Sequence, residues 1–96
     1  MGDAPVVTRT YVVKPANGLH LRPWSRFVKL AHQYKCRIEV VKESARSDGR
    51  SMLALLTLAA KCGDEISIEA DGDDAEEAVT ALIAMLEAYE DSDESA

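Results

Sequence analysis

The chain has 96 residues, of which 47% are apolar, and a formal net charge of −6 at pH 7. This length supports a single domain over residues 1–96 with one modest core, and the acidic balance argues against nucleic acid as a general partner. No apolar run approaches the ~20 residues of a membrane span and no signal-peptide pattern opens the chain, so we expect a cytoplasmic protein with no membrane partner.

The first half of the chain alternates between strand and helix patterns. After a loose leader at residues 1–5, the run Val6–Lys14 is rich in Val, Thr and Tyr and is typical of a strand. Arg22–Tyr34 carries apolar residues at a helical period, with Trp24 in the stripe, and Arg37–Val41 alternates again as a strand. The polar segment Glu43–Asp48 has room only for a turn and a short strand.

The second half repeats this alternation. Ser51 opens a short helix, and Glu65–Ala70 shows the most regular strand pattern of the chain. Asp73–Glu76 resembles an N-cap followed by its acidic partner at the third helical position, and a long apolar stripe then runs to Tyr89. The acidic tail, residues 91–96, is expected to be disordered. An antiparallel sheet with helices on one face would bury every stripe, which predicts an α+β fold in the order β-α-β-β-α-β-α.

Two cysteines, Cys36 and Cys62, are too few for a disulfide framework or a zinc site. Cys36 falls in a strand pattern and Cys62 lies beside a turn glycine, so we expect buried or bystander thiols. The sequence contains no metal-ligand cluster, glycine-rich nucleotide loop or catalytic triad, so neither a metal nor a cofactor is expected.

The run Gly18–Trp24 places a histidine between a glycine turn and the start of a helix. Its glycine can adopt φ > 0, and Pro23 suits a first helical turn. His20 therefore lies just before a helix N-terminus, where backbone N–H groups on Leu21 or Arg22 and the helix dipole can bind an anion. With the Arg22 guanidinium nearby, such a histidine could carry a phosphoryl group. The alternatives are a histidine that fills a turn and an arginine that begins a helix.

The helix after Ser51 is apolar on nearly every side. So short a helix, on the surface of a small domain, cannot hide all of these side chains, and an exposed cluster is typical of a docking surface. The side chains concerned are Met52, Leu53, Leu55, Leu56 and Leu58. The alternative is a helix that lies wholly in the core. Ser51 itself is explained as an N-cap, with or without phosphorylation.

Basic side chains gather nearer to the histidine motif than to the acidic segments. They are Arg22, Arg26, Lys29, Lys35, Arg37 and Arg50. A basic face on an acidic protein favours an acidic protein partner, although long basic side chains can simply decorate a helix.

The two motifs together resemble the HPr family, the histidine-containing phosphocarriers of the bacterial phosphoenolpyruvate-dependent sugar phosphotransferase system. Asn17–Pro23 is similar to the phosphohistidine signature of that family, and Arg50–Leu53 is similar to its serine site. The resemblance spans about Arg9–Tyr89. It implies an open-faced β-sandwich, in which a four-stranded antiparallel sheet carries three helices on one face.

The resemblance also implies roles for single residues. Nδ1 of His20 would accept a phosphoryl group from enzyme I and pass it to a histidine of an enzyme II A domain, while Arg22 helps to hold it. Ser51 would be phosphorylated in some bacteria by a regulatory kinase, HPr kinase/phosphorylase. Partners would bind Met52, Leu53, Leu56, Lys29 and Arg50. The protein would thus be a substrate of other enzymes, without turnover of its own, and is expected to be a monomer.

The chain departs from the family pattern beside the histidine. Trp24 stands where a small residue is usual, and Leu21 where Ala or Thr is usual. Trp24 belongs to the apolar stripe, but its position next to His20 also makes it a candidate for partner binding. The Leu55-Leu56 pair in the second helix resembles the nitrogen-related branch of the family. The alternatives are therefore a regulatory protein that acts through Ser51 or protein binding, and an interaction module with a structural histidine.

Overall fold

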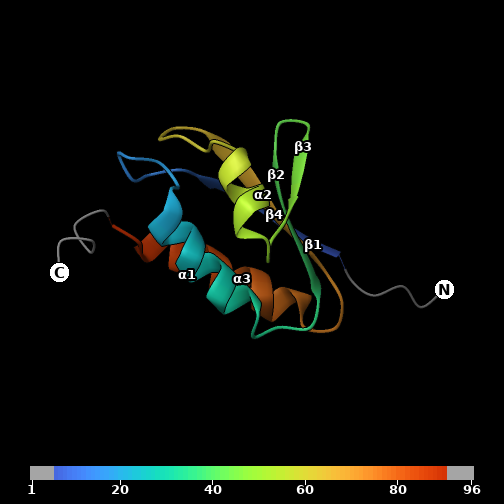
Figure 1. Cartoon of the computed structure of the whole chain (residues 1–96). Helices are drawn as coiled ribbons and strands as arrows, with labels where there is room; N and C mark the ends of the chain where they lie inside the picture. The colour runs from blue at the N-terminus through green and yellow to red at the C-terminus, as the bar shows by residue number, and fades with distance from the viewer. Residues whose placement is uncertain (1–5, 91–96) are drawn as a thin grey trace.

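The computed structural model describes residues 6–90, and these form the seven expected elements in the expected order (Figure 1). The predicted leader and acidic tail lie outside the described residues. The elements are β1 (Val6–Val12), α1 (Leu21–Ala31), β2 (Arg37–Lys42), β3 (Ala45–Asp48), α2 (Met52–Thr57), β4 (Glu65–Asp71) and α3 (Ala75–Ala88).

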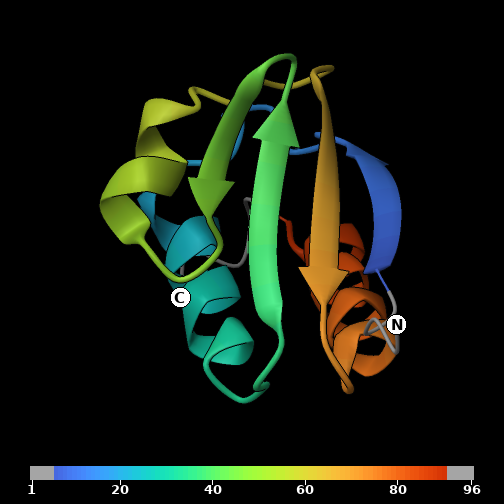
Figure 2. The same cartoon turned by 90° about the vertical axis from the view of Figure 1, so that its right-hand side faces the viewer.

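The four strands form one antiparallel sheet in the order β1-β4-β2-β3. Figure 2 shows this sheet in front of α1 and α3, so that the opposite face of the sheet is left open. The register places Ile68 of β4 between Arg9 of β1 and Val40 of β2. The predicted open-faced β-sandwich is confirmed.

The core lies between the sheet and the helices because alternate strand residues point inward. Ile38, Val40, Ile66 and Ile68 are fully buried in the two central strands. They meet the apolar stripes of the helices, which are Trp24, Phe27 and Ala31 in α1 and Ala75, Ala78, Val79, Leu82 and Leu86 in α3. The helical and strand periods in the sequence therefore assigned the core faces correctly.

The start of α3 differs from the predicted capping box. The pattern placed the N-cap at Asp73, but Asp74 occupies the N-cap position, and its side chain makes no capping bond to the helix. Its carboxylate instead accepts hydrogen bonds from the backbone N–H groups of Lys35 at 2.8 Å and Cys36 at 2.9 Å. These bonds lower the pKa of Asp74 below its ordinary value. Asp74 thus connects the β4–α3 turn to the α1–β2 turn, and Glu76 pairs with Arg9 of β1 at 2.8 Å.

Both cysteines are free thiols, as expected. Cys36 is buried, and burial, followed by its contact with the Asp74 carboxylate, raises the pKa of its thiol to about 11. Within residues 6–90, no group of three or more His, Cys, Asp or Glu side chains is placed so that it could bind a metal ion. No described helix combines the length and apolar character that crossing a membrane requires.

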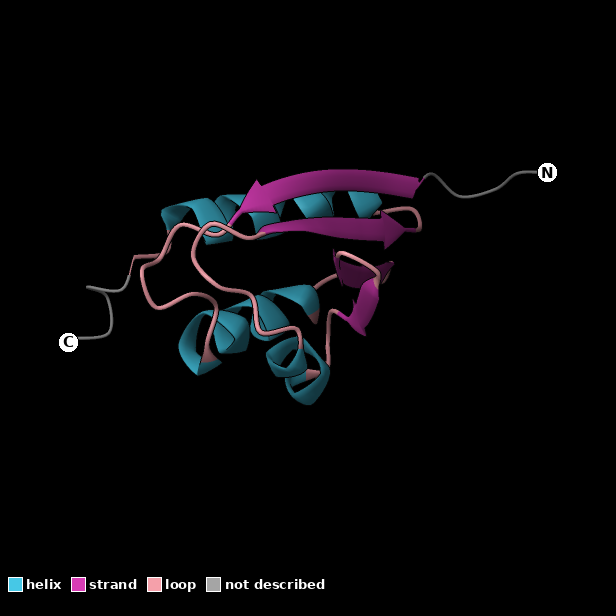
Figure 3. Cartoon of the chain, turned by 90° about the horizontal axis from the view of Figure 1, so that it is seen from above, coloured by secondary structure: helices cyan, strands magenta, loops and turns pink. Residues whose placement is uncertain are grey.

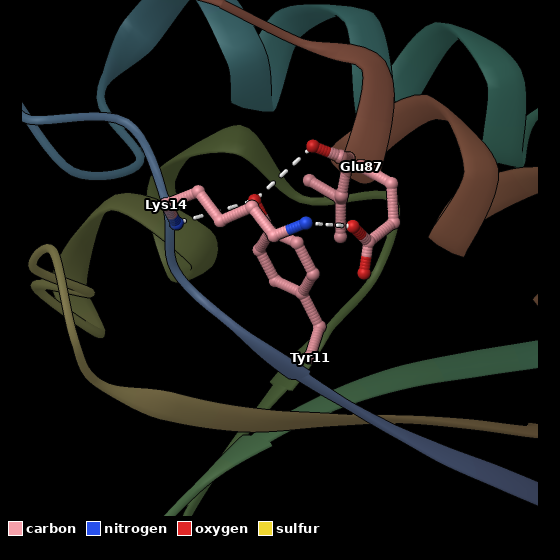
Figure 4. A network of polar contacts seen from close by, with 4 residues as sticks. Tyr11, Lys14 and Glu87 are labelled. Atoms are coloured by element: carbon pink, nitrogen blue, oxygen red, sulfur yellow. Dashed lines mark hydrogen bonds and ion pairs between the residues drawn. The ribbon is translucent and has the colours of Figure 1, made fainter.

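A polar network fastens the end of β1 to the end of α3 (Figure 4). The Tyr11 hydroxyl donates a hydrogen bond to the Leu86 carbonyl at 3.1 Å and accepts one from the Lys14 N–H at 3.4 Å. The Lys14 ammonium pairs with the Glu87 carboxylate. Burial raises the pKa of Tyr11, which keeps its hydroxyl a proton donor. The network holds the chain just before the loop that leads to His20.

Candidate functional site

His20 is the N-cap residue of α1, as predicted from the glycine turn before it and the proline after it. Its backbone is extended (φ −105°, ψ −158°), and its carbonyl accepts a hydrogen bond from the Trp24 N–H at 3.2 Å. The side chain is half-buried, and its Nε2 atom is buried. This burial disfavours Nε2 as the ring nitrogen that meets a reacting group.

The loop that carries His20 is fixed against the loop between α2 and β4. Leu19 N–H donates to the Ala60 carbonyl at 2.9 Å, and Gly18 N–H donates to the Pro15 carbonyl at 2.8 Å. Gly18 has φ +72°, and a Cβ at this position would stand 2.6 Å from the Ala60 oxygen. Seen from above, the two loops run side by side (Figure 3). Glycine is therefore required for both its conformation and its small size.

The first turn of α1 presents backbone donors beside the histidine. The N–H groups of Leu21 and Arg22 have no acceptor within the helix, because the intrahelical ladder starts at the bond from Trp24 to His20. Pro23 contributes no N–H group to this turn. These donors and the positive end of the helix dipole favour an anion at the side chain of His20.

A shallow groove of about 530 Å³ runs from His20 along the exposed side of α1. Its lining residues are His20, Leu21, Arg22, Ser25, Arg26 and Lys29. The structure thus brings the predicted site residues Arg22 and Lys29 together with the histidine. It adds Arg26, which was expected only as one of the basic residues that face an acidic partner. Arg22 and Arg26 are four residues apart and so lie on one helix face. This spacing was the feature of the sequence that could have assigned Arg26 to the site.

Arg26 is held by an aromatic ring from another helix. Its guanidinium carbon lies 5.3 Å from the centroid of the Tyr89 ring, a cation–π distance. Tyr89 is the buried C-cap residue of α3. The end of α3 therefore lies next to the groove, and sequence alone gave no sign of this long-range contact.

The helix α2 divides its apolar side chains between the core and the surface. Leu53 is 76% exposed and Leu56 is 36% exposed, whereas Leu55 is 0% and Leu58 6% exposed. Met52 is half-buried. We call Met52, Leu53 and Leu56 the apolar patch. Of the five predicted side chains these three remain accessible, and the other two are core residues.

Ser51 caps α2, as predicted. Its Oγ accepts a hydrogen bond from the Ala54 N–H at 3.2 Å. The residue is half-buried and precedes the apolar patch directly in the chain. A charge at Ser51 would therefore stand at the edge of that patch.

Trp24 does not contribute to a contact surface, so its assignment to partner binding was wrong. Its side chain is 0% exposed and meets Phe27 edge-on, with ring centroids 5.2 Å apart. The helical period turns Trp24 inward with Phe27 and Ala31, away from the groove that starts at His20.

Arg50 also has a different place from the one expected. Its Nη2 donates hydrogen bonds to the carbonyls of Tyr34 at 2.5 Å and Cys36 at 3.0 Å. These bonds satisfy backbone acceptors at the junction of α1 and β2. Arg50 is better explained as a structural residue than as part of a partner-facing surface.

Comparison with known proteins decides the family. A family model described as "PTS HPr component phosphorylation site" matches residues 7–88. The chain belongs to the HPr family of the phosphotransferase system.

Individual HPr relatives resemble the chain over most of its length. Phosphocarrier protein HPr of Borreliella burgdorferi is 34% identical over 86 residues, which cover 90% of this chain and 100% of the relative. The crystal structure of phosphocarrier protein HPr from Bacillus anthracis superposes with a TM-score of 0.78 at 34% identity, covering 83% of this chain and 95% of that chain. The HPr-like protein Crh of Halalkalibacterium halodurans is 33% identical over 82 residues, covering 85% and 98% of the two chains.

Proposed function

We propose that this protein is a phosphocarrier that accepts a phosphoryl group from enzyme I on Nδ1 of His20 and passes it to a histidine of an enzyme II A domain. The observation that carries this proposal is the position of His20. Its Nε2 is buried, which leaves Nδ1 at the N-terminus of α1 beside Arg22 and a basic groove. Relatives in this family are named phosphocarriers. In this role the protein is a substrate of other enzymes in the cytoplasm and serves sugar uptake.

Each transfer exchanges one bond to phosphorus for another. The lone pair of Nδ1 forms the N–P bond while the bond between phosphorus and its donor breaks, and the second transfer reverses this at the acceptor histidine. Donors on Leu21 and Arg22 stabilise the charged oxygens of the phosphoryl group in both the bound and the transferring state. The solvent-exposed Arg22 guanidinium adds a charge-assisted contact.

Two neighbouring surfaces would receive both partners. The basic groove attracts acidic side chains around the partner's active centre, and the apolar patch on α2 supplies area to bury. Since α1 and α2 are in contact, one partner could cover both at once. The same surface would serve enzyme I and the A domain in turn.

The direct test is phosphorylation with phosphoenolpyruvate, Mg²⁺ and enzyme I. We expect one phosphoryl group that acid removes, and none in His20→Ala. The matched control is His32→Ala, because His32 lies exposed at the other end of α1. This variant should be labelled as wild type is. Labelling of His20→Ala, or its absence from wild type, would disprove the proposal.

The second candidate function is regulation through Ser51. It is favoured by the position of Ser51 at the edge of the apolar patch and by the similarity of the chain to an HPr-like protein, Crh. A phosphate there would be acid-stable and would depend on HPr kinase/phosphorylase and ATP. An acid-stable phosphate on Ser51 with no transfer through His20 would favour this function over the first. Acid-labile phosphate on His20 alone would favour the carrier.

A further inference from the structure

We infer that Arg26, held in place by the ring of Tyr89, is a second guanidinium that binds the phosphoryl group on His20. This inference rests on the proposed function of His20. The first guanidinium is that of Arg22, which belongs to the phosphohistidine motif. The evidence is the shared groove, the direction of the side chain along α1 and the contact with Tyr89.

The position of Arg26 on α1 directs it toward the histidine. Arg22 and Arg26 are four residues apart, so they lie on one face, with Arg26 starting about 6 Å further along the helix axis. Side chains on a helix tilt toward its N-terminus, where His20 is the cap residue. Both arginines line the same groove as His20. Two guanidinium groups can therefore approach a phosphoryl group from one side.

The ring of Tyr89 limits the conformations that the Arg26 side chain can adopt. An exposed arginine normally samples many rotamers, and fixing them costs free energy when a ligand binds. The Tyr89 ring lies 5.3 Å below the guanidinium carbon of Arg26 and is itself buried at the end of α3. The ring restricts the arginine before any phosphoryl group arrives. Guanidinium groups also suit this task because they stack on aromatic rings while their N–H groups still bind phosphate oxygens.

A phosphoryl partition experiment tests the inference. Wild type and Arg26→Gln share a limiting amount of phosphoryl groups in the presence of catalytic enzyme I, and mass spectrometry gives the phosphorylated fraction of each at equilibrium. Enzyme I only catalyses the exchange, so differences in docking affect the rate and cancel in the final ratio. We expect wild type to hold about threefold more phosphate, the ratio typical of one exposed charge contact.

Matched variants separate binding of phosphate from other roles. Arg37→Gln removes an exposed arginine of β2 that lies outside the groove, and it should share phosphate equally with wild type. Tyr89→Leu removes the ring and should lose part of the advantage, whereas Tyr89→Phe keeps the ring and should restore it. Circular dichroism checks that each variant is folded.

Two outcomes would count against the inference itself, and a third against the proposed function on which it rests. Equal sharing between wild type and Arg26→Gln, even with a slower approach to equilibrium, would make Arg26 a docking residue and overturn it. A wild-type share in Tyr89→Leu would overturn the positioning role of the ring. If wild type takes up no phosphoryl group at all, it is the proposed function of His20 that fails.

Discussion

Gly18 packs directly against Ala60, so the loop that carries the histidine lies in contact with the loop after α2. An added Cβ at Gly18 would stand 2.6 Å from the Ala60 carbonyl oxygen, the same oxygen that accepts the Leu19 N–H. The position of His20 therefore depends on a contact between segments that are far apart in the chain.

Gly18→Ala should destabilise the protein by about 2 kcal/mol or more, since it combines left-handed strain with a steric clash. It should also slow phosphorylation of His20, because the loop must move. The control is Gly63→Ala, where φ is +93° but a Cβ meets nothing within 4 Å. That variant should lose only about 1 kcal/mol and keep the transfer rate. Urea unfolding and phosphorylation kinetics measure both, and equal effects in the two variants would contradict the account.

Ala59→Gly should stabilise the protein. Ala59 follows α2 with φ 52°, a left-handed conformation that costs alanine about 1 kcal/mol and glycine almost nothing. The gain in the free energy of unfolding should reach about 0.5 kcal/mol, since glycine also has more freedom in the unfolded chain. The comparison variant is Ala54→Gly, inside α2, which should lose about 1 kcal/mol. A loss in both variants would be inconsistent with the backbone of Ala59 described above.

Leu53→Glu should weaken binding to enzyme I or the A domain while leaving the thermal transition nearly unchanged. Leu53 is 76% exposed, so little packing is lost, but a charge enters the apolar patch. Leu55→Ala, two residues away at 0% exposure, should instead lose about 2–5 kcal/mol of stability. Calorimetric titration and thermal unfolding separate the two effects. Unaltered partner affinity in Leu53→Glu would remove the patch from the docking surface.

Ser51→Asp should keep the fold and slow phosphorylation of His20, because a charge at the edge of the apolar patch opposes an acidic partner. High salt should reduce this effect by screening the exposed charges. Ser51→Ala should lose about 1 kcal/mol with the cap to Ala54, yet transfer phosphate nearly as wild type does. If Ser51→Asp and wild type react equally fast at low salt, Ser51 is only a cap.

Asp74→Asn should make the free energy of unfolding less dependent on pH in acid. Hydrogen bonds from Lys35 and Cys36 lower the pKa of Asp74 in the folded protein. The carboxylate therefore stabilises the fold above its unfolded pKa of about 3.9, and this stabilisation is lost as the pH falls through the lower, folded pKa. Urea midpoints between about pH 5 and pH 2 should fall more steeply for wild type than for the variant. Asp73→Asn, an exposed neighbour, should follow wild type, and parallel curves for Asp74→Asn would refute the role of its carboxylate.

The sequence predicted those features that depend on local pattern. The strand and helix periods gave the element order and the core faces, and the glycine and proline around His20 located it at the start of α1. Trp24 is instructive here, because its helical period indicated the core correctly, while its proximity to His20 wrongly favoured a contact role. Position along a helix decides orientation more reliably than distance along the chain.

Contacts between distant segments could not be predicted in this way. Asp74 is the N-cap residue of its helix, yet its carboxylate binds backbone donors of another turn. Arg50 likewise binds carbonyls at the end of α1, and Arg26 meets Tyr89 from α3. Such pairings depend on how the elements pack, which no local pattern specifies.

Nδ1 of His20 is the atom that we expect to carry the phosphoryl group. The most direct measurement is heteronuclear NMR of protein with ¹⁵N-labelled histidine after phosphorylation by phosphoenolpyruvate and enzyme I. Coupling between phosphorus and one ring nitrogen identifies the bonded atom. We expect coupling to Nδ1 of His20, because Nε2 is buried in the fold. Coupling to Nε2 of His20, or to either nitrogen of His32, would contradict it.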